Sequence, residues 1–258
     1  MFEMKSDYDM IVWKLPEDMP YVNIYPIGDT HFGSPEFNYK KWKSWKQQIL
    51  ADPFSRVVLL GDMIDNGLKN SKTDVYKATM SPIEQKRMLA EELMDIKHLI
   101  LAGVQGNHEH RSTRETGDCP MYDVMAKLDL EHLYRENMAF IKVNVGQRTA
   151  DRQFSYGLVA SHGGSKPKVK KFVPYVDGMD VFMSGHIHQA SSEFPAKIVM
   201  DMKNEVVRLT PVTPVVVPSF ADYGGYAMNR LYEPTSNHLM PIITLDGTDR
   251  KEVNIHWV

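Results

Sequence analysis

Residues 21–33 read YVNIYPIGDTHFG, and this stretch decides the fold of the chain. The run from Tyr21 to Ile27 is rich in apolar and β-branched residues, as in a buried strand, and it ends at Gly28-Asp29. The same pattern returns at residues 56–65, RVVLLGDMID, where Gly61-Asp62 follows the apolar run. We therefore expect two strands that each deliver a carboxylate at the carboxyl end.

The pattern occurs three more times along the chain. Residues 100–109 read ILAGVQGNHE, residues 158–164 read LVASHGG, and residues 181–188 read VFMSGHIH. In a parallel α/β sheet, ligands bind outside the carboxyl ends of the strands. The sequence therefore predicts five strand ends that converge on one rim.

Two helical patterns separate the first three strands. The first is predicted to run from a cap at Asn38 to a stop at Asp52-Pro53, with a buried face formed by Trp42, Trp45 and Ile49. The second begins at a capping box over residues 81–84 and is predicted to run to about His98. The resulting order is strand-helix-strand-helix-strand.

Beyond Gln189 the sequence changes to β-rich runs, at residues 196–201, 205–213, 215–217, 241–244 and 251–257. In the last run Val253, Ile255 and Trp257 alternate as one buried face. We expect this tail to pack with the preceding strands, so that residues 1–258 form a single domain.

The five motifs concentrate side chains that bind divalent cations. Hard and borderline ions take carboxylate oxygen, amide oxygen and neutral imidazole as ligands. The candidate metal ligands are Asp29, His31, Asp62, Asn107, His162, His186 and His188. Such a set suffices for two adjacent ions. Each motif taken alone would serve equally well to cap or turn the backbone.

In this order the motifs resemble those of the calcineurin-like metallophosphoesterase superfamily, namely D-x-H, G-D-x-x-D, G-N-H-[ED], H and G-H-x-H. The resemblance implies an α/β fold, a two-sheet β-sandwich of mixed strands flanked by helices, with the β-rich tail as the second sheet. It also implies a hydrolase that acts on phosphoric ester bonds. Its cofactors would be two divalent metal ions, with Mn2+ expected and Fe, Zn, Ni or Mg as alternatives.

The resemblance also implies roles for single residues. Asp62 would bridge the two metal ions. The other ligands would divide between them, with Asp29, His31 and His188 on one ion and Asn107, His162 and His186 on the other. His108 would be the catalytic residue, which orients the substrate phosphate or protonates the leaving-group oxygen. The alternative is that His108 only fills the turn after Asn107.

Asp65 and Glu109 have two interpretations each. Either carboxylate could hold the free ring nitrogen of His31 or His108. Equally, Asp65 could cap the following turn, and Glu109 could pair with Arg111.

The substrate class follows from a departure at residues 61–67, GDMIDNG. The Ser/Thr protein phosphatases have a motif resembling GDxVDRG, whose arginine binds phosphate, and Asn66 takes the place of that arginine here. The GHIH motif and the short interval from His162 to His186 resemble the nuclease and small phosphodiesterase branches, whereas GNHE and SHGG resemble the phosphatase branch. We predict a phosphodiesterase or nuclease. The alternatives are a phosphomonoesterase, including protein phosphatases, and a non-catalytic metal-binding scaffold.

Four residues outside the ligand set are candidates for binding a phosphodiester substrate such as DNA or RNA. They are Arg111, Lys166, Lys168 and Tyr223. Two further lysines, Lys170 and Lys171, extend the basic stretch after His162. Stacking on tyrosine and neutralisation of phosphates would suit nucleotides or single strands. The alternative for all of them is an ordinary solvated surface.

Bulk composition sets the remaining expectations. The formal net charge of -3 argues against a basic coat that wraps nucleic acid. The single Cys119 cannot form an intramolecular disulfide, and the chain shows neither a secretory leader nor an apolar run that would span a bilayer. We expect a cytoplasmic location and no membrane partner. The sequence makes no prediction of the oligomeric state.

Overall fold

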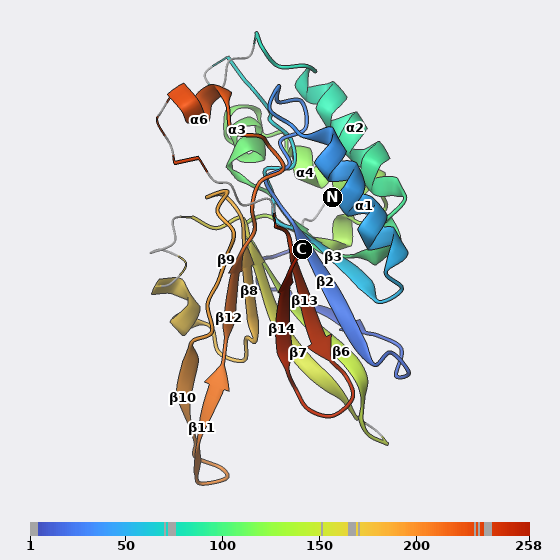
Figure 1. Cartoon of the computed structure of the whole chain (residues 1–258), viewed down its shortest axis with the longest axis vertical. Coiled ribbons are helices and arrows are strands. Elements are labelled where there is room, and N and C mark those ends of the chain that lie inside the picture. The colour runs from blue at the N-terminus through green and yellow to red at the C-terminus, as the bar shows by residue number, and fades with distance from the viewer. Residues whose placement is uncertain are drawn as a thin grey trace.

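The computed structural model describes residues 5–69, 71, 76–150, 152–164, 169, 171–229, 231, 233–234 and 239–258. Its strands form two six-stranded sheets and a separate two-stranded ribbon (Figure 1). In the first sheet the strands are ordered β14 (Val253–Trp257), β13 (Pro241–Asp246), β2 (Tyr21–Ile27), β3 (Ser55–Leu59), β4 (Ile100–Val104) and β5 (Tyr134–Arg135). The strands from β2 to β5 run parallel to one another, and β13 and β14 are antiparallel additions at one edge.

The second sheet is also mixed. Its strands are ordered β1 (Ile11–Lys14), β6 (Met138–Thr149), β7 (Arg152–Ser161), β8 (Val181–Ser184), β12 (Thr213–Val216) and β9 (Ser191–Ser192). The two sheets share one apolar core, to which Ile24 and Val58 contribute from the first sheet and Ile141 and Leu158 from the second. The fold is therefore the expected two-sheet sandwich of mixed strands flanked by helices.

Helices cover the outer face of the first sheet (Figure 1). They are α1 (Tyr39–Ala51), α2 (Pro82–Met94) and α4 (Pro120–Lys127). Helix α3 (Asn107–Thr116) packs against α4, and the short helix α6 (Gly225–Asn229) lies at the upper end of the molecule in Figure 1. Among the described residues, 3-10 turns occur at η1 (Lys97–Leu99), η2 (Glu131–Leu133) and η3 (Val173–Tyr175). Within the residues that the structure describes, no helix is long and apolar enough to cross a membrane.

Helix α1 confirms the sequence prediction. The Asn38 side chain accepts a hydrogen bond from the Lys41 backbone N–H, which caps the first turn. The predicted apolar face, which consists of Trp42, Trp45 and Ile49, is buried. Helix α2 also begins as predicted, but it ends at Met94 and not near His98, because the chain tightens into the 3-10 turn η1 before it enters β4.

The β-rich tail does not form the second sheet, so that part of the prediction was wrong. Strand β12 pairs with β8 and β9 pairs with β12, whereas β13 pairs with β2 and β14 with β13. Strands β10 (Ala196–Asp201) and β11 (Val206–Pro211) form the separate ribbon. The second sheet is built mainly on the β6–β7 hairpin, and the tail only completes the edges of both sheets.

Helices α1 and α2 are joined by a carboxylate that is largely buried. Glu92 accepts hydrogen bonds from the Tyr39 hydroxyl at 2.6 Å and from the Trp42 indole at 2.9 Å. The ammonium of Lys46, which is 6% exposed, lies 2.8 Å from the same carboxylate, and Lys43 completes the cluster from the surface. Removal of the charge on Glu92 would leave the Lys46 ammonium buried without its main partner.

We predict that Glu92→Gln lowers the free energy of unfolding by about 3 kcal/mol at neutral pH. Burial alone would raise the pKa of Glu92, but hydrogen bonds from Lys46 and Tyr39 outweigh it and lower the pKa to about 2. The stabilisation is therefore complete above the ordinary carboxyl pKa and is lost as the pH falls towards 2. Urea unfolding of both proteins over that pH range measures the difference.

The matched control is Asp95→Asn, because Asp95 also contacts Lys46, at 3.1 Å, but its side chain is 59% exposed. This variant should lose less than about 1 kcal/mol. An effect of Glu92→Gln that stayed constant between neutral and acid pH would contradict the charge-based account.

Candidate metal centre

Five loops meet at one end of the sandwich, and each follows a strand as the sequence predicted. The loops after β2, β3 and β4 come from the first sheet, whereas the loops after β7 and β8 come from the second. The rim is therefore shared by two sheets and does not belong to a single one. Among the described residues, the titratable side chains of these loops form three overlapping groups whose ligand atoms lie within 4.8 Å of one another.

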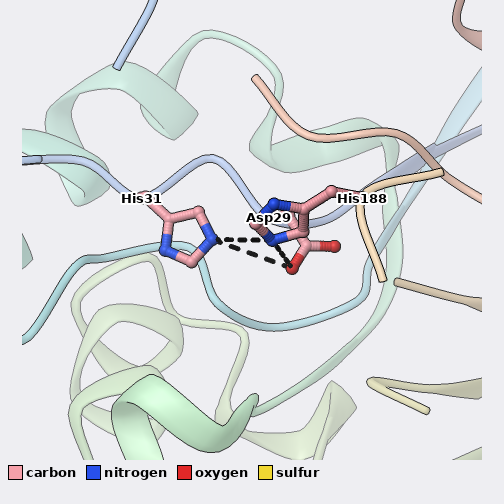
Figure 2. A group of neighbouring side chains, drawn as sticks. All are labelled: Asp29, His31 and His188. Carbon is pink, nitrogen blue, oxygen red and sulfur yellow. Dashed lines mark hydrogen bonds and ion pairs between the residues drawn. The ribbon is translucent and has the colours of Figure 1, made fainter. Parts of the chain in front are cut away.

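The first group consists of Asp29, His31 and His188, which Figure 2 shows pointing toward one another. Nε2 of His31 lies 3.2 Å from Nε2 of His188. Oδ1 of Asp29 lies 3.2 Å from Nε2 of His188 and 3.8 Å from Nε2 of His31. Asp29 and His31 are buried, and His188 reaches them from the partly exposed side.

The second group consists of Asp62, His162 and His186, and the amide of Asn107 joins it. Oδ1 of Asn107 lies 2.7 Å from Nδ1 of His186 and 3.0 Å from Nε2 of His162. Oδ2 of Asp62 lies 3.3 Å from Nε2 of His162. The structure thus brings together all seven side chains that the sequence offered as metal ligands.

Asp62 lies where the two groups meet. It shares the third group with His31 and His108, and its Oδ2 lies 3.7 Å from Nε2 of His108. The His31 and His108 rings are in edge contact, with centroids 4.5 Å apart. This position is the one that a carboxylate between two ions would need.

Backbone groups fix both carboxylates. The His186 N–H donates to Oδ2 of Asp29 at 2.8 Å, and the His108 N–H donates to Oδ1 of Asp62 at 2.7 Å. In each carboxylate the second oxygen faces the histidine ring nitrogens. Oδ1 of Asp29 is buried and, among the described residues, has no hydrogen-bond partner.

Backbone carbonyls orient two of the imidazoles. Nδ1 of His162 lies 2.9 Å from the Leu60 carbonyl oxygen, and Nδ1 of His108 lies 2.7 Å from the Asp65 carbonyl oxygen. Each Nδ1–H therefore donates to a carbonyl, and each Nε2 is left facing the centre. A buried carboxylate oxygen and convergent ring nitrogens fit divalent cations, which carboxylate, amide and imidazole groups bind together.

Asp65 and Glu109, for which the sequence left two roles open, have different surroundings. Asp65 lies next to His108 rather than His31, because its Oδ1 is 3.5 Å from Nδ1 of His108. Glu109 neither orients an imidazole nor pairs with Arg111, since it is fully buried and accepts hydrogen bonds from four backbone N–H groups. These belong to Asp62, Met63, Ile64 and Gly106. Glu109 thereby ties the Asp62 loop to the start of α3.

Two supporting residues were not identified from the sequence. Asn66 is buried, and its amide donates to the His108 carbonyl at 2.7 Å and to the Ser112 hydroxyl at 2.9 Å. Ser219 donates to the Asp29 carbonyl at 2.8 Å. For Glu109, the capping-box spacing from Gly106 was a signal of its role that the sequence contained. The contact of Ser219 with Asp29 joins segments far apart in the sequence, so no local pattern indicates it.

The motif glycines permit a close approach of backbone to carboxylate. A methyl group on Gly185 would overlap the Asp29 carboxylate, and one on Gly106 would overlap Asp62. Left-handed backbone is also concentrated here, as five of the seven candidate ligands have a positive φ. They are Asp29, His31, Asp62, His186 and His188. Each such conformation costs about 1 kcal/mol or more, so the loops are held in place by their surroundings.

Two histidines of the centre have pKa values that are shifted in opposite directions. Burial lowers the pKa of His31 to about 3, with His108 adding to the effect. For His162 burial acts in the same direction, but the nearby Asp62 carboxylate outweighs it and raises the pKa to about 10. A cation that binds here must therefore displace a proton from His162.

The candidate substrate-binding residues are partly described. Arg111 lies one turn into α3, and its Nη1 donates to the Asp65 carbonyl at 3.3 Å, the same carbonyl that receives the His108 ring N–H. Tyr223 is 40% exposed. It lies two residues after Ala221, which forms a β-bridge with Phe37, and Phe37 follows the loop that carries His31. Lys166 and Lys168 lie outside the described residues.

Comparison with known proteins gives one sequence match. A model of the calcineurin-like phosphoesterase family matches residues 22–190, which is well over half of the chain. No curated protein sequence matches.

Many solved structures resemble the fold, and three of them illustrate the low similarity. A novel archaeal phosphodiesterase has 15% identity and a TM-score of 0.47, and the match covers 92% of this chain and 100% of that one. Zinc-bound Vps29 from Entamoeba histolytica has 11% identity and a TM-score of 0.39, with coverage of 92% and 98%. The calcineurin-like phosphoesterase YfkN from Bacillus subtilis has 11% identity and a TM-score of 0.43, with coverage of 93% and 91%.

We predict that Gly185→Ala lowers the affinity for divalent cations at least roughly tenfold, because the added methyl displaces the Asp29 carboxylate. Gly178→Ala is the control, since Gly178 has a φ of 74° and open space around it. That variant should lose about 1 kcal/mol of stability and keep its metal affinity. Calorimetric titration with Mn2+ measures both, and equal affinities of Gly185→Ala and wild type would refute the role of this glycine.

Proposed function

This chain belongs to the calcineurin-like phosphoesterase family, and we propose that it is a two-metal phosphodiesterase or nuclease that hydrolyses nucleic acid or nucleotide phosphodiesters. The family and the His/Asp groups make it a metal-dependent hydrolase of phosphoric ester bonds. The proposal adds the number of ions and the kind of ester. The kind of ester rests on one observation, the buried side chain of Asn66.

The proposed ligands follow the two groups of side chains. Asp29, His31 and His188 would hold one ion, Asn107, His162 and His186 the other, and Asp62 both. Bound divalent cations supply positive charge to phosphate oxygens and activate water for attack on phosphorus. Mn2+ is the proposed ion, with Fe, Zn, Ni and Mg as the alternatives to be tested.

His108 has the position and orientation of a proton donor. Its Nδ1–H is engaged by the Asp65 carbonyl, and its Nε2 faces the centre beside Asp62. Although burial opposes protonation, attraction to Asp62 and the hydrogen bond with Asp65 raise the pKa of His108. In the imidazolium form, Nε2–H would protonate the oxygen of the leaving group.

Asn66 supports a diester rather than a monoester substrate. In the Ser/Thr phosphatases an arginine stands at this position and binds phosphate, but here the amide turns inward to the His108 carbonyl and Ser112. The position therefore presents no cation to the substrate. A diester phosphate carries one negative charge fewer than a monoester dianion, so it depends less on such a cation.

One observation favours the phosphomonoesterase alternative, which includes the protein phosphatases. The Arg111 guanidinium lies beside the same Asp65 carbonyl as His108, and it could bind a phosphate oxygen from there. A non-catalytic scaffold has the least support, because His108 and all seven candidate ligands are present and gathered together.

The nucleic-acid part of the proposal rests on Tyr223 and the position of its loop. Tyr223 is exposed in a loop that follows Phe220, whose backbone N–H donates to the Asp29 carbonyl. The loop therefore borders the centre, and a base could stack there. We retain DNA and RNA as proposed substrates, and a cytoplasmic location on the ground of the single cysteine.

His108→Ala should separate chemistry from metal binding. It removes a proton donor without removing a proposed ligand, so turnover should fall roughly a hundredfold while metal content stays close to that of wild type. Asp62→Asn should instead lose metal, because the carboxylate between the two groups loses its charge. Metal analysis and turnover of bis-p-nitrophenyl phosphate test both, and equal loss of metal in the two variants would make His108 a ligand.

A substrate panel should distinguish diesterase from monoesterase. We expect faster hydrolysis of bis-p-nitrophenyl phosphate, single-stranded DNA or RNA than of p-nitrophenyl phosphate, and little effect of Arg111→Ala on the small diester. Arg114→Ala is the control, since Arg114 is exposed on the same helix. A preference for the monoester that Arg111→Ala abolishes, with Arg114→Ala unaffected, would establish the alternative.

A further inference from the structure

The ribbon of β10 and β11 stands apart from both large sheets. Its two strands pair with each other from Ala196 opposite Pro211 to Asp201 opposite Val206, and over the described residues neither strand pairs with another sheet. Figure 1 shows the ribbon projecting from the lower end of the molecule, while the helices α1 to α3 lie at the upper end. An isolated two-stranded ribbon is only marginally stable in water unless its apolar face is covered.

One face of the ribbon is apolar and exposed. Residues directly opposite each other share a face, which places Ile198 with Leu209 and Met200 with Val207. These four side chains are 74%, 72%, 70% and 68% exposed, respectively. We call this set the apolar ribbon face. Such a contiguous apolar surface is unusual on a protein that is covered only by water.

The opposite face of the ribbon is different in character. It carries Lys197 opposite Thr210, Val199 opposite Arg208, and Asp201 opposite Val206. Lys197 is bound to the body of the protein through the Val176 carbonyl at 2.6 Å. This face therefore mixes charged residues with Val199 and Val206, which are each 41% exposed, and Lys197 ties it to the rest of the protein.

The charges near the tip are balanced and do not favour lipid headgroups or nucleic acid as the covering partner. Asp201 and Glu205 flank Lys203 in the connection between the strands, and Arg208 lies 3.4 Å from Asp201, so these four residues carry no net charge. Anionic lipid headgroups and nucleic acid phosphates bind to clusters of basic residues, and the tip does not form such a cluster. The apolar ribbon face calls for an apolar protein surface of similar shape.

We infer that the apolar ribbon face packs against the same face of a second copy of this chain, forming a symmetric dimer. Two identical flat apolar faces are self-complementary about a two-fold axis, and ribbons packed face to face form a small sandwich. The packing would supply each ribbon with the covering layer that a two-stranded unit lacks.

The area of apolar surface is sufficient for such a dimer. A fully exposed aliphatic side chain offers on the order of 100 Å². Phe194 at the base and Met202 at the tip, 68% and 81% exposed, add to the four residues of the apolar ribbon face. Each copy thus brings about 500 Å², and the total of about 1,000 Å² reaches the lower limit of specific interfaces. The base also borders a cavity of about 420 Å³, lined in part by Phe194, Ala196 and Val212, which extends the apolar surface.

Sedimentation velocity of the full chain over a wide concentration range tests the dimer. Wild type should sediment as a dimer, and Ile198→Glu should weaken dimerisation roughly a hundredfold, because each interface would then bury two like charges. Val199→Glu is the matched control. It places the same charge on the next residue, on the opposite face and across from Arg208, so it should remain a dimer.

Hydrolysis of bis-p-nitrophenyl phosphate should be equal in all three proteins, which shows that the domain remains folded. A wild type that is monomeric at every concentration would overturn the inference. Binding of that monomer to neutral lipid vesicles would not restore it. Persistence of the dimer in Ile198→Glu, or its equal loss in Val199→Glu, would also overturn it.

Discussion

The structure depends on holding two buried carboxylates near each other, away from bulk solvent. Asp29 and Asp62 are 0% and 2% exposed, and they lie in loops that follow neighbouring parallel strands. Two like charges in this position repel each other unless cations or dipoles compensate. Backbone N–H groups of His186 and His108 bind one oxygen of each carboxylate, and the remaining oxygens face the ring nitrogens. Cations bound between the two groups would compensate both negative charges.

This requirement explains features of the loops that otherwise look unfavourable. Left-handed backbone at five candidate ligands, and glycines at Gly106 and Gly185, allow main chain to pass within contact of a carboxylate. Glu109 gathers four backbone N–H groups and so fixes the Asp62 loop against α3. The apolar core shared by both sheets supplies the rigidity that keeps these strained loops in place.

Much of the centre was predictable because its chemistry is local in sequence. Apolar runs followed by Gly-Asp, Gly-Asn-His or Gly-His identify both the strand end and the ligand, and a strand end is a fixed place in an α/β sheet. The destination of the tail was not predictable, since the β-rich runs at residues 215–217 and 241–244 indicate strands but not which neighbour each strand will pair with. The role of Asn66 was missed for the same reason, because its partner Ser112 belongs to another element.

The central claim is that five loops from two sheets assemble a site for two cations that share Asp62. Anomalous scattering from crystals grown with Mn2+ tests it most directly. The account predicts two anomalous peaks per chain, one beside Asp29, His31 and His188 and one beside Asn107, His162 and His186, with the Asp62 carboxylate in contact with both. A single peak at saturating Mn2+, or two peaks of which only one contacts Asp62, would contradict it.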